Sequence, residues 1–456
     1  MKKAKIVFIF ILCICLIKSF SACASQTVHE NDSIKVYPEN ESHENYTNYQ
    51  LMNVFDVEAN PLIKPAEDEH DKVAQYVANG ANDFAFSLGS ELIADVKNEN
   101  FVFSPLAVWL PIAALVNATD EKNKSALLKT LNAEGVSEVD MNQAASRMLF
   151  DLTKTRKIGG VLQSSPVKIV NAIFVSNNDV IKMDFAQTYM DYFRGSSVNV
   201  DFSSHQAIDA VNQWVSNNTD GWITDLVQGF HPATVAAIAN AIYFSDDWGL
   251  QFDPELTEEG VFKAPDGDMS AIFMLQKDTI QLYYEDDMIQ ALPLSFCSGG
   301  GLYIILPKSE NAMDLFSSMT NDYFIEIQKN SAQAIGTLKL PPFTIENDIL
   351  GLKEALTMLG VTLFDENAPA LKGLTEGNTS LFLSDAIQKA VIKVDENGTT
   401  AAAGMYSGMP MDEGLCFDPT KPFEMICDKP FMFILYDLTH DGGYQVIFTG
   451  VVNQPY

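Results

Sequence analysis

The chain has few of the cysteines on which small secreted scaffolds depend. It contains six cysteines among 456 residues. Two of them, Cys13 and Cys15, lie inside an N-terminal apolar segment, and the others are Cys23, Cys297, Cys416 and Cys427. So few cysteines at such wide spacing exclude a disulfide framework as the basis of the fold. Cys416 and Cys427 are either two free thiols or the ends of one small disulfide-closed loop.

Positive charge is also scarce. The chain has 29 Lys and Arg residues against 60 Asp and Glu residues, which is a formal net charge of -31. A surface this acidic repels phosphate backbones and anionic lipids, so no nucleic-acid partner is expected. Hydrophobic residues make up 47% of the chain and aromatic residues 11%, which is enough to bury a large core.

The sequence carries no recognisable catalytic or metal-binding motif. It lacks a G-x-S-x-G nucleophile elbow, an H-E-x-x-H zinc motif, paired C-x-x-C motifs and an EF-hand loop. Beyond His70 only three histidines are available as bases, namely His205, His231 and His440. Two acidic clusters, Asp246–Asp247 and Glu285–Asp287, are interpreted as solvated turns. We therefore expect neither an enzyme nor a bound metal or cofactor.

The N-terminus has the features of an export signal. Three lysines precede an apolar run over Ile6–Ile17, which is too short to span a bilayer comfortably. Ser21-Ala22-Cys23 resembles a bacterial lipobox, in which the cysteine is acylated, although Phe20 stands where leucine is usual. The A-x-A sequence at 22–24 also fits cleavage by ordinary signal peptidase. Residues 1–23 thus predict an extracellular or cell-surface protein, which is either freely secreted or attached to the membrane only through a lipid on Cys23.

Two regions follow the signal. Residues 24–70 are rich in Asn, Glu, Ser and Tyr without a regular apolar pattern, which indicates a flexible acidic spacer. Residues 71–456 contain no Pro/Gly/Ser linker and predict one large α+β domain. Helices are expected from Asp71 onward and over Trp214–Val227, and Gly299–Gly301 is expected to form a hairpin turn. Strands are expected over Ile169–Val175, Ala291–Leu294, Tyr303–Leu306, Ala386–Val394 and Phe431–Tyr436.

The segment after Val394 is unusual for so acidic a chain. The fifteen residues from Asn397 to Met411 carry no charge. In extended form the residues near its start present small neutral side chains to both faces, which suits a strand that inserts into an existing sheet, where a buried charge would cost several kcal/mol. About twelve inserted residues would form about twelve ladder hydrogen bonds, on the order of 6–18 kcal/mol in total. Such a segment can store and release enough free energy to do mechanical work.

An ordered series of short motifs over 71–456 resembles the serpin family. The motifs are Asn100–Pro105, Asn171–Val175, Asn212–Trp214 with Gly221–Val227, Ala239–Phe244 followed by Trp248, Lys339–Phe343, Glu396–Thr399, Lys429–Phe433 and Thr449–Pro455. The resemblance implies an α+β serpin fold, a single domain with three β-sheets, surrounding helices and an exposed reactive-centre loop at about 396–422. It also implies a suicide-type inhibitor, in which a serine protease cleaves the loop and the hinge side of the loop then inserts into the main sheet.

The resemblance also assigns roles to individual residues. The hinge would comprise Glu396, Gly398, Thr399, Ala401, Ala402, Ala403 and Gly404, and its small uncharged members fit the inhibitory pattern of the family. The groups that gate sheet opening would be Ser104, Asn240, Trp248 and Gln388. Gln388 stands where many members have histidine, and Ala107 stands where many have serine.

Family spacing implies where the loop is cut. It places the scissile residue about fourteen positions beyond Gly398, at Asp412, with Glu413 on the leaving side. A cut one step earlier, between Met411 and Asp412, is favoured because methionine suits extracellular elastase-like or subtilisin-like serine proteases. An aspartate would suit an Asp-directed enzyme, and trypsin-like targets are not expected because Lys421 lies too far along. We expect a monomer, and the alternative function is a non-inhibitory surface lipoprotein that uses the same scaffold to bind a partner.

Overall fold

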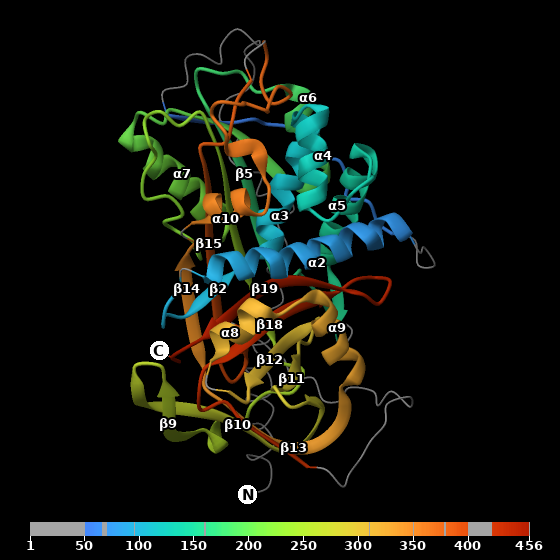
Figure 1. The fold of residues 1–456 in the computed structure, drawn as a ribbon, viewed down its shortest axis with the longest axis vertical. Helices are drawn as coiled ribbons and strands as arrows, with labels where there is room; N and C mark the ends of the chain where they lie inside the picture. Colours follow the sequence, from blue (N-terminus) through green and yellow to red (C-terminus); the bar gives the residue numbers. More distant parts are fainter. Residues whose placement is uncertain are drawn as a thin grey trace, which may run out of the picture. The chain divides into compact units, whose positions relative to one another are not determined.

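The structure, a computed structural model, describes residues 51–65, 71–94, 96–158, 161–309, 311–349, 351–377, 380–399 and 422–455. All of them belong to one unit, Tyr46–Tyr456. Figure 1 shows helices packed around β-sheets within this unit, so the expected α+β fold is confirmed. The predicted signal segment 1–23, Cys23 included, lies outside the described residues.

Six strands form the main sheet, in the order β1-β6-β5-β7-β15-β14. Their bounds are Met52–Val54 (β1), Gly195–Val200 (β6), Val167–Ser176 (β5), Ala236–Phe244 (β7), Asp385–Val394 (β15) and Phe343–Asp348 (β14). β15 runs parallel to β7 and β5 runs parallel to β6, whereas the other neighbours are antiparallel. The strands expected at 169–175 and 386–394 are therefore confirmed.

A second, nine-stranded sheet has the order β17-β13-β10-β11-β12-β18-β19-β2, with β9 also paired to β10. The bounds are Phe423–Ile426 (β17), Ala332–Leu340 (β13), Gly267–Glu285 (β10), Ile289–Ser295 (β11), Gly301–Pro307 (β12), Phe431–Leu438 (β18), Tyr444–Val452 (β19), Phe101–Phe103 (β2) and Glu258–Ala264 (β9). β10 is 19 residues long and pairs in turn with β9, β13 and β11, so it joins two parts of this sheet. Two short pairs lie apart from it, β8 (Asp246–Asp247) with β16 (Gly398–Thr399) and β3 (Arg156–Ile158) with β4 (Val161–Gln163).

The remaining strand predictions also hold. β11, β12 and β18 contain the predicted strands at 291–294, 303–306 and 431–436. Gly299 and Gly300 connect β11 to β12 with φ values of 109° and 69°, in the left-handed region where glycine is favoured, so the hairpin turn is confirmed.

Nine helices of the described chain surround the sheets. They are Lys72–Ile93 (α2), Pro105–Ala114 (α3), Glu121–Thr130 (α4), Glu138–Thr153 (α5), Met183–Phe193 (α6), His205–Asn218 (α7), Ala312–Ser318 (α8), Asn321–Asn330 (α9) and Leu352–Met358 (α10). α2 begins where expected, because the Asp71 carboxylate accepts hydrogen bonds from the amides of Val73 and Ala74. Every residue of α3 is buried, and α3 packs on one face of the main sheet, which we call the inner face. α7 covers the opposite, outer face with a separate, smaller apolar core.

The predicted spacer over 24–70 is wrong for residues 51–65. β1 pairs with β6 and forms one edge of the main sheet, and the Phe55 side chain is only 4% exposed. Asn60 donates its amide and its side-chain nitrogen to the two carboxylate oxygens of Asp191 at 2.9 and 2.8 Å. We call residues 51–65 the N-terminal strap. Its backbone forms a strand because the exposed edge of β6 offers partners, a tertiary effect that composition does not report.

The helix predicted over Trp214–Val227 is wrong beyond Asn218. Asp220 and Gly221 have φ values of 53° and 81°, which no α-helix accommodates. The chain leaves α7 there, and residues 219–235 run as a linker to β7. The apolar residues Ile223, Leu226 and Val227, which suggested a helix, instead pack into the outer core under α7.

Candidate functional site: the hinge and the seam of the main sheet

The hinge begins at the end of β15, beside the boundary between β15 and β7, which we call the seam. Seven residue pairs join the two strands in parallel, from Asp385 opposite Ala237 to Val391 opposite Tyr243. Side chains alternate along β15, so Gln388 points to the inner face and Lys389 to the outer face. The seam is therefore lined by polar groups on both faces.

Three of the four predicted gate residues meet on the inner face of the seam, and all three are buried. Gln388 Nε2 donates to the Ser104 carbonyl oxygen at 2.8 Å and to Asn240 Oδ1 at 2.7 Å, while Gln388 Oε1 accepts from the Ser104 amide at 3.0 Å. The Ser104 hydroxyl caps α3 and donates to the carbonyl oxygen of Ile447 at 2.7 Å. Because one amide supplies two donors and an acceptor, glutamine links α3 to both strands of the seam.

A fourth buried polar residue continues this row, and sequence reasoning did not single it out. Asn171 on β5 lies opposite Asn240 on β7, which in turn lies opposite Gln388 on β15. Asn240 Nδ2 and both side-chain amide atoms of Asn171 have no hydrogen-bond partner among the described residues. The signal was available in the sequence, as an asparagine in an otherwise apolar strand.

The fourth predicted gate residue, Trp248, holds the turn that follows β15. Its indole Nε1 donates to the Asp395 carbonyl oxygen at 2.9 Å, and its backbone amide donates to the Asn397 carbonyl oxygen at 2.9 Å. The ring is 1% exposed and stacks on Phe296 at a centroid distance of 4.8 Å. Trp248 therefore lies at the hinge rather than with the other three gate residues, and its contacts fix where the loop leaves the sheet.

The first hinge residues are buried, although the reactive loop was expected to be exposed from 396 onward. Gly398 and Thr399 form β16 and pair with Asp247 and Asp246 of β8, and Thr399 is fully buried. A Cβ on Gly398 would lie 2.1 Å from the Asp246 carbonyl oxygen, so only glycine fits at this position. Glu396 is half-buried and its Oε1 accepts from the Thr257 hydroxyl at 3.3 Å.

Asp246 is not the solvated residue that the sequence suggested. Its side chain is buried, and its carboxylate accepts from the Ser298 hydroxyl, from the Ser298 amide at 3.2 Å and from the Asp247 amide at 2.9 Å. Burial raises its pKa to about 6, against the lowering effect of these hydrogen bonds. The other acidic cluster, Glu285–Asp287, begins at the last residue of β10 and continues into the connection to β11, and Glu285 and Asp287 are exposed. In the described part of the chain no group of three or more His, Cys, Asp or Glu residues is arranged to hold a metal ion.

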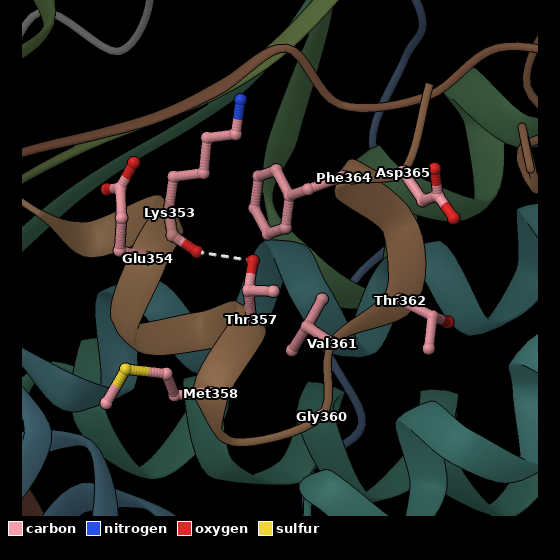
Figure 2. Close-up of a pocket in the computed structure, with 9 residues that line it drawn as sticks. All are labelled: Lys353, Glu354, Thr357, Met358, Gly360, Val361, Thr362, Phe364 and Asp365. Atoms are coloured by element: carbon pink, nitrogen blue, oxygen red, sulfur yellow. Dashed lines mark hydrogen bonds between the residues drawn. The ribbon is translucent and has the colours of Figure 1, made fainter. Parts of the chain in front are cut away.

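A hollow of about 680 Å³ lies beside α10 and the following 3₁₀ turn, Thr362–Phe364. Figure 2 shows the residues that line it. Met358, Val361 and Phe364 line it, and the Thr357 hydroxyl is used within the helix, since it donates to the Lys353 carbonyl oxygen at 2.8 Å. Lys353 Nζ donates to the Ser384 carbonyl oxygen, immediately before β15. A ten-residue strand spans about 30 Å, so this hollow is far from the hinge at the other end of β15.

A family model described as "Serpin (serine protease inhibitor)" matches residues 79–455. The chain belongs to the serpin family. This serpin is 26% identical to mouse alpha-1-antitrypsin 1-2 over 396 residues, which is 86% of this chain and 92% of that protein. Its fold is similar to that of Serpin48 from the insect Tenebrio molitor, with a TM-score of 0.72, 24% identity, and coverage of 85% of this chain and 100% of the other. It is equally similar in fold to human thyroxine-binding globulin, with a TM-score of 0.71, 22% identity, and coverage of 84% and 99%.

Part of the predicted site of this serpin lies outside the described residues. This part comprises the remaining hinge residues Ala401, Ala402, Ala403 and Gly404, the scissile region Met411, Asp412 and Glu413, and Cys416. Cys427, the second thiol of the possible loop, is a free and fully buried cysteine whose pKa is raised by burial. In the part that the structure describes, no helix is long and apolar enough to cross a bilayer.

Proposed function

We propose that this serpin is an irreversible, suicide-type inhibitor of extracellular serine proteases. The observation that carries the proposal is the position of the uncharged segment. It starts at Asn397 and continues through the buried residues Gly398 and Thr399, shortly beyond the end of β15 and beside a seam whose inner face is lined by buried amides. Cleavage of the loop would free this segment to enter the seam.

The topology of the main sheet favours this movement. A strand that turns back after Thr399 would run antiparallel to β15, and because β7 is parallel to β15, it would be antiparallel to β7 as well. Insertion would thus replace one parallel pairing by two antiparallel pairings, which are slightly more stable per residue. With about twelve new ladder bonds, the gain is on the order of 6–18 kcal/mol, comparable to the stability of a whole domain.

The composition of the segment supports an inhibitor over the alternative function. An inserted strand must bury Thr399, Ala401 and Ala403 on one face, and none of these side chains is charged or large. A binding module has no reason to keep charge out of this loop in a chain of net charge -31. The likeness of the fold to thyroxine-binding globulin keeps a non-inhibitory binding protein as the second candidate, in which the reactive loop would not insert.

The target and the location are part of the proposal. We favour a cut between Met411 and Asp412 by an elastase-like or subtilisin-like protease. The alternative is a cut between Asp412 and Glu413 by an Asp-directed enzyme. We expect no trypsin-like target. Export through the signal at 1–23 would bring the protein to such enzymes, either anchored through a lipid on Cys23 or freely secreted. No cofactor or nucleic acid is required, and the inhibitor would act as a monomer.

A protease panel tests the proposal. The mature protein is incubated with elastase-like, subtilisin-like, Asp-directed and trypsin-like enzymes, and the products are separated on denaturing gels. We expect an SDS-stable adduct with at least one of the first three, together with a released C-terminal peptide whose mass identifies the cut. Cleavage without any adduct across the panel would favour the non-inhibitory alternative.

A further inference from the structure

A short β-hairpin lies beside the hinge. Among the described residues its two strands, Arg156–Ile158 (β3) and Val161–Gln163 (β4), pair only with each other and belong to neither of the large sheets. The chain runs from β4 into β5, whose first residue, Val167, pairs with Phe244 at the end of β7. Phe244 in turn is two residues from β8, the partner of the hinge strand β16. The hairpin therefore emerges at the same pole of the main sheet as the hinge.

The first leg of the hairpin is fixed to the elements that carry the hinge. Arg156 Nη1 donates to the Ser298 carbonyl oxygen at 2.9 Å and to the Ser298 hydroxyl at 3.1 Å. Arg156 Nη2 donates to the buried carboxylate of Asp437. The amide and the hydroxyl of Ser298 donate to the carboxylate of Asp246, whose backbone pairs with Thr399. Arg156 is thus connected through Ser298 and Asp246 to the first residues of the reactive loop.

The second leg is fixed as well. The Ser165 hydroxyl donates to the Leu152 carbonyl oxygen on α5 at 2.6 Å. The Pro166 carbonyl oxygen accepts from the amide of Ser245, directly before β8, at 2.9 Å. An isolated two-stranded hairpin is only marginally stable in water. These contacts at its base, rather than its own three residue pairs, therefore hold the hairpin in place.

The hairpin carries exposed apolar side chains that the fold does not use. Val161 is 63% exposed and Leu162 is 73% exposed. Side chains alternate along β4, so these two residues lie on opposite faces of the hairpin. Neither residue belongs to the two apolar cores of the described chain. Two adjacent aliphatic side chains left in water at a firmly held position indicate a surface that contacts a partner.

The partner that comes within reach of this hairpin is the protease that attacks the reactive loop. Asp412 lies thirteen positions beyond Thr399, so the predicted cut is at most about 45 Å from Thr399 even along a fully extended chain. A protease domain of about 230 residues is itself about 45 Å across. A protease of this size that is bound to the loop covers the pole at which the hairpin is fixed.

We propose that the β3–β4 hairpin is a second docking site for the target serine protease, in which Val161 and Leu162 contact apolar surface beside the active-site cleft of the protease. This inference rests on the proposed function and adds a determinant of specificity outside the reactive loop. Because its base is already fixed, the hairpin loses little conformational entropy on binding. An apolar contact also suits a chain of net charge -31, since it does not require a basic protease. The contact raises the rate at which the protease engages the loop and leaves the hinge unchanged.

The chain offers a matched pair of double variants. The hairpin variant, Val161→Ser with Leu162→Ser, removes both apolar side chains of the proposed docking site. The control variant, Val139→Ser with Met358→Ser, removes two side chains that are similarly exposed, at 61% and 68%. Val139 lies in the first turn of α5, about 20 Å from the end that leads into the hairpin, and Met358 lies on α10, at the pole opposite the hinge. All four positions are exposed, so serine should leave the fold intact, and thermal melting checks this.

The experiment measures the second-order rate constant at which the reactive loop is consumed, counting adduct and cleaved protein together. The mature wild-type protein and both variants react with the protease of the panel that consumes the wild-type loop fastest. We expect the hairpin variant to react roughly tenfold more slowly than wild type, at an unchanged ratio of adduct to cleaved protein. The control variant should stay within about twofold of wild type.

The outcomes separate this inference from the proposed function. Equal rates for the two variants would overturn the docking site and leave the inhibitor proposal intact. A changed ratio of adduct to cleaved protein would also overturn it, because the substitutions would then act on the hinge through Arg156. Slower cleavage of the hairpin variant without any adduct would support the docking site and overturn the inhibitor. A wild-type dimer that the hairpin variant fails to form in sedimentation would assign the hairpin to a second copy of this chain instead, and a loop that no protease cuts would overturn both proposals.

Discussion

The buried carboxylate of Asp246 makes the hinge sensitive to pH. The pKa is raised from 3.8 to about 6 because the side chain is only 9% exposed. Between about pH 4 and 6 the folded state therefore binds a proton more tightly than the unfolded state. Raising the pKa of Asp246 by about two pH units corresponds to about 3 kcal/mol in the free energy of unfolding. This contribution is present below about pH 4 and is lost by pH 7.

Asp246→Asn removes this dependence. Asparagine is neutral at every pH, but it replaces one acceptor oxygen, so it loses a hydrogen bond to Ser298 or Asp247 worth about 1 kcal/mol. The variant should be less stable than wild type by about 1 kcal/mol at pH 4 and more stable by about 1–2 kcal/mol at pH 7. The stabilised hinge should also slow formation of the protease adduct at pH 7.

The assay is urea-induced unfolding of the native protein at several pH values from 4 to 7.5. The informative quantity is the difference between variant and wild type, because other carboxylates titrate in both proteins. Asp268→Asn, at an exposed position on β10, controls for the loss of one surface charge. A difference between Asp246→Asn and wild type that does not change with pH would refute the assignment of a raised pKa to Asp246.

Three further predictions concern the hinge, the gate and the strap. Thr399→Arg should turn the inhibitor into a substrate, and it should also destabilise the native protein by several kcal/mol because Thr399 is already fully buried. Denaturing gels measure the ratio of cleaved protein to protease adduct, and a thermal melting curve measures the loss of stability. An unchanged adduct yield would refute this prediction. Gln388→Ala should lower native stability by about 2–4 kcal/mol, because it leaves the Ser104 amide and Asn240 Oδ1 without the hydrogen bonds that Gln388 makes to them. Urea unfolding measures the loss, and a loss below about 1 kcal/mol would contradict this role. Asn60→Ala should cost about 1 kcal/mol and increase hydrogen exchange in β1 and β6, and unchanged exchange there would show that the strap is not held by Asp191.

Local patterns predicted most of the elements near the site. Apolar alternation located β15, and the helical spacing of apolar residues after Asp71 located α2, because both signals depend on neighbours in the chain. The prediction of a helix over 214–227 was wrong beyond Asn218, because Asp220 and Gly221 adopt left-handed backbone conformations. Hydrophobic periodicity carries no information on these conformations. The prediction of a flexible spacer was wrong for the strap, because the strand β1 forms only where β6 offers hydrogen-bond partners.

The sequence by itself determined the family, through an ordered series of motifs, and the chemistry of the hinge, through the absence of charge from Asn397 to Met411. Only the tertiary structure decided which polar groups meet. The sequence predicted Asp246 to be a solvated turn residue, whereas the structure shows a buried carboxylate beside Thr399. The sequence showed Lys389 only as one residue of a strand, whereas the structure places its ammonium near three carboxylates. The reason is physical, because burial and charge pairing depend on distances between segments far apart in the chain, and sequence spacing does not contain those distances.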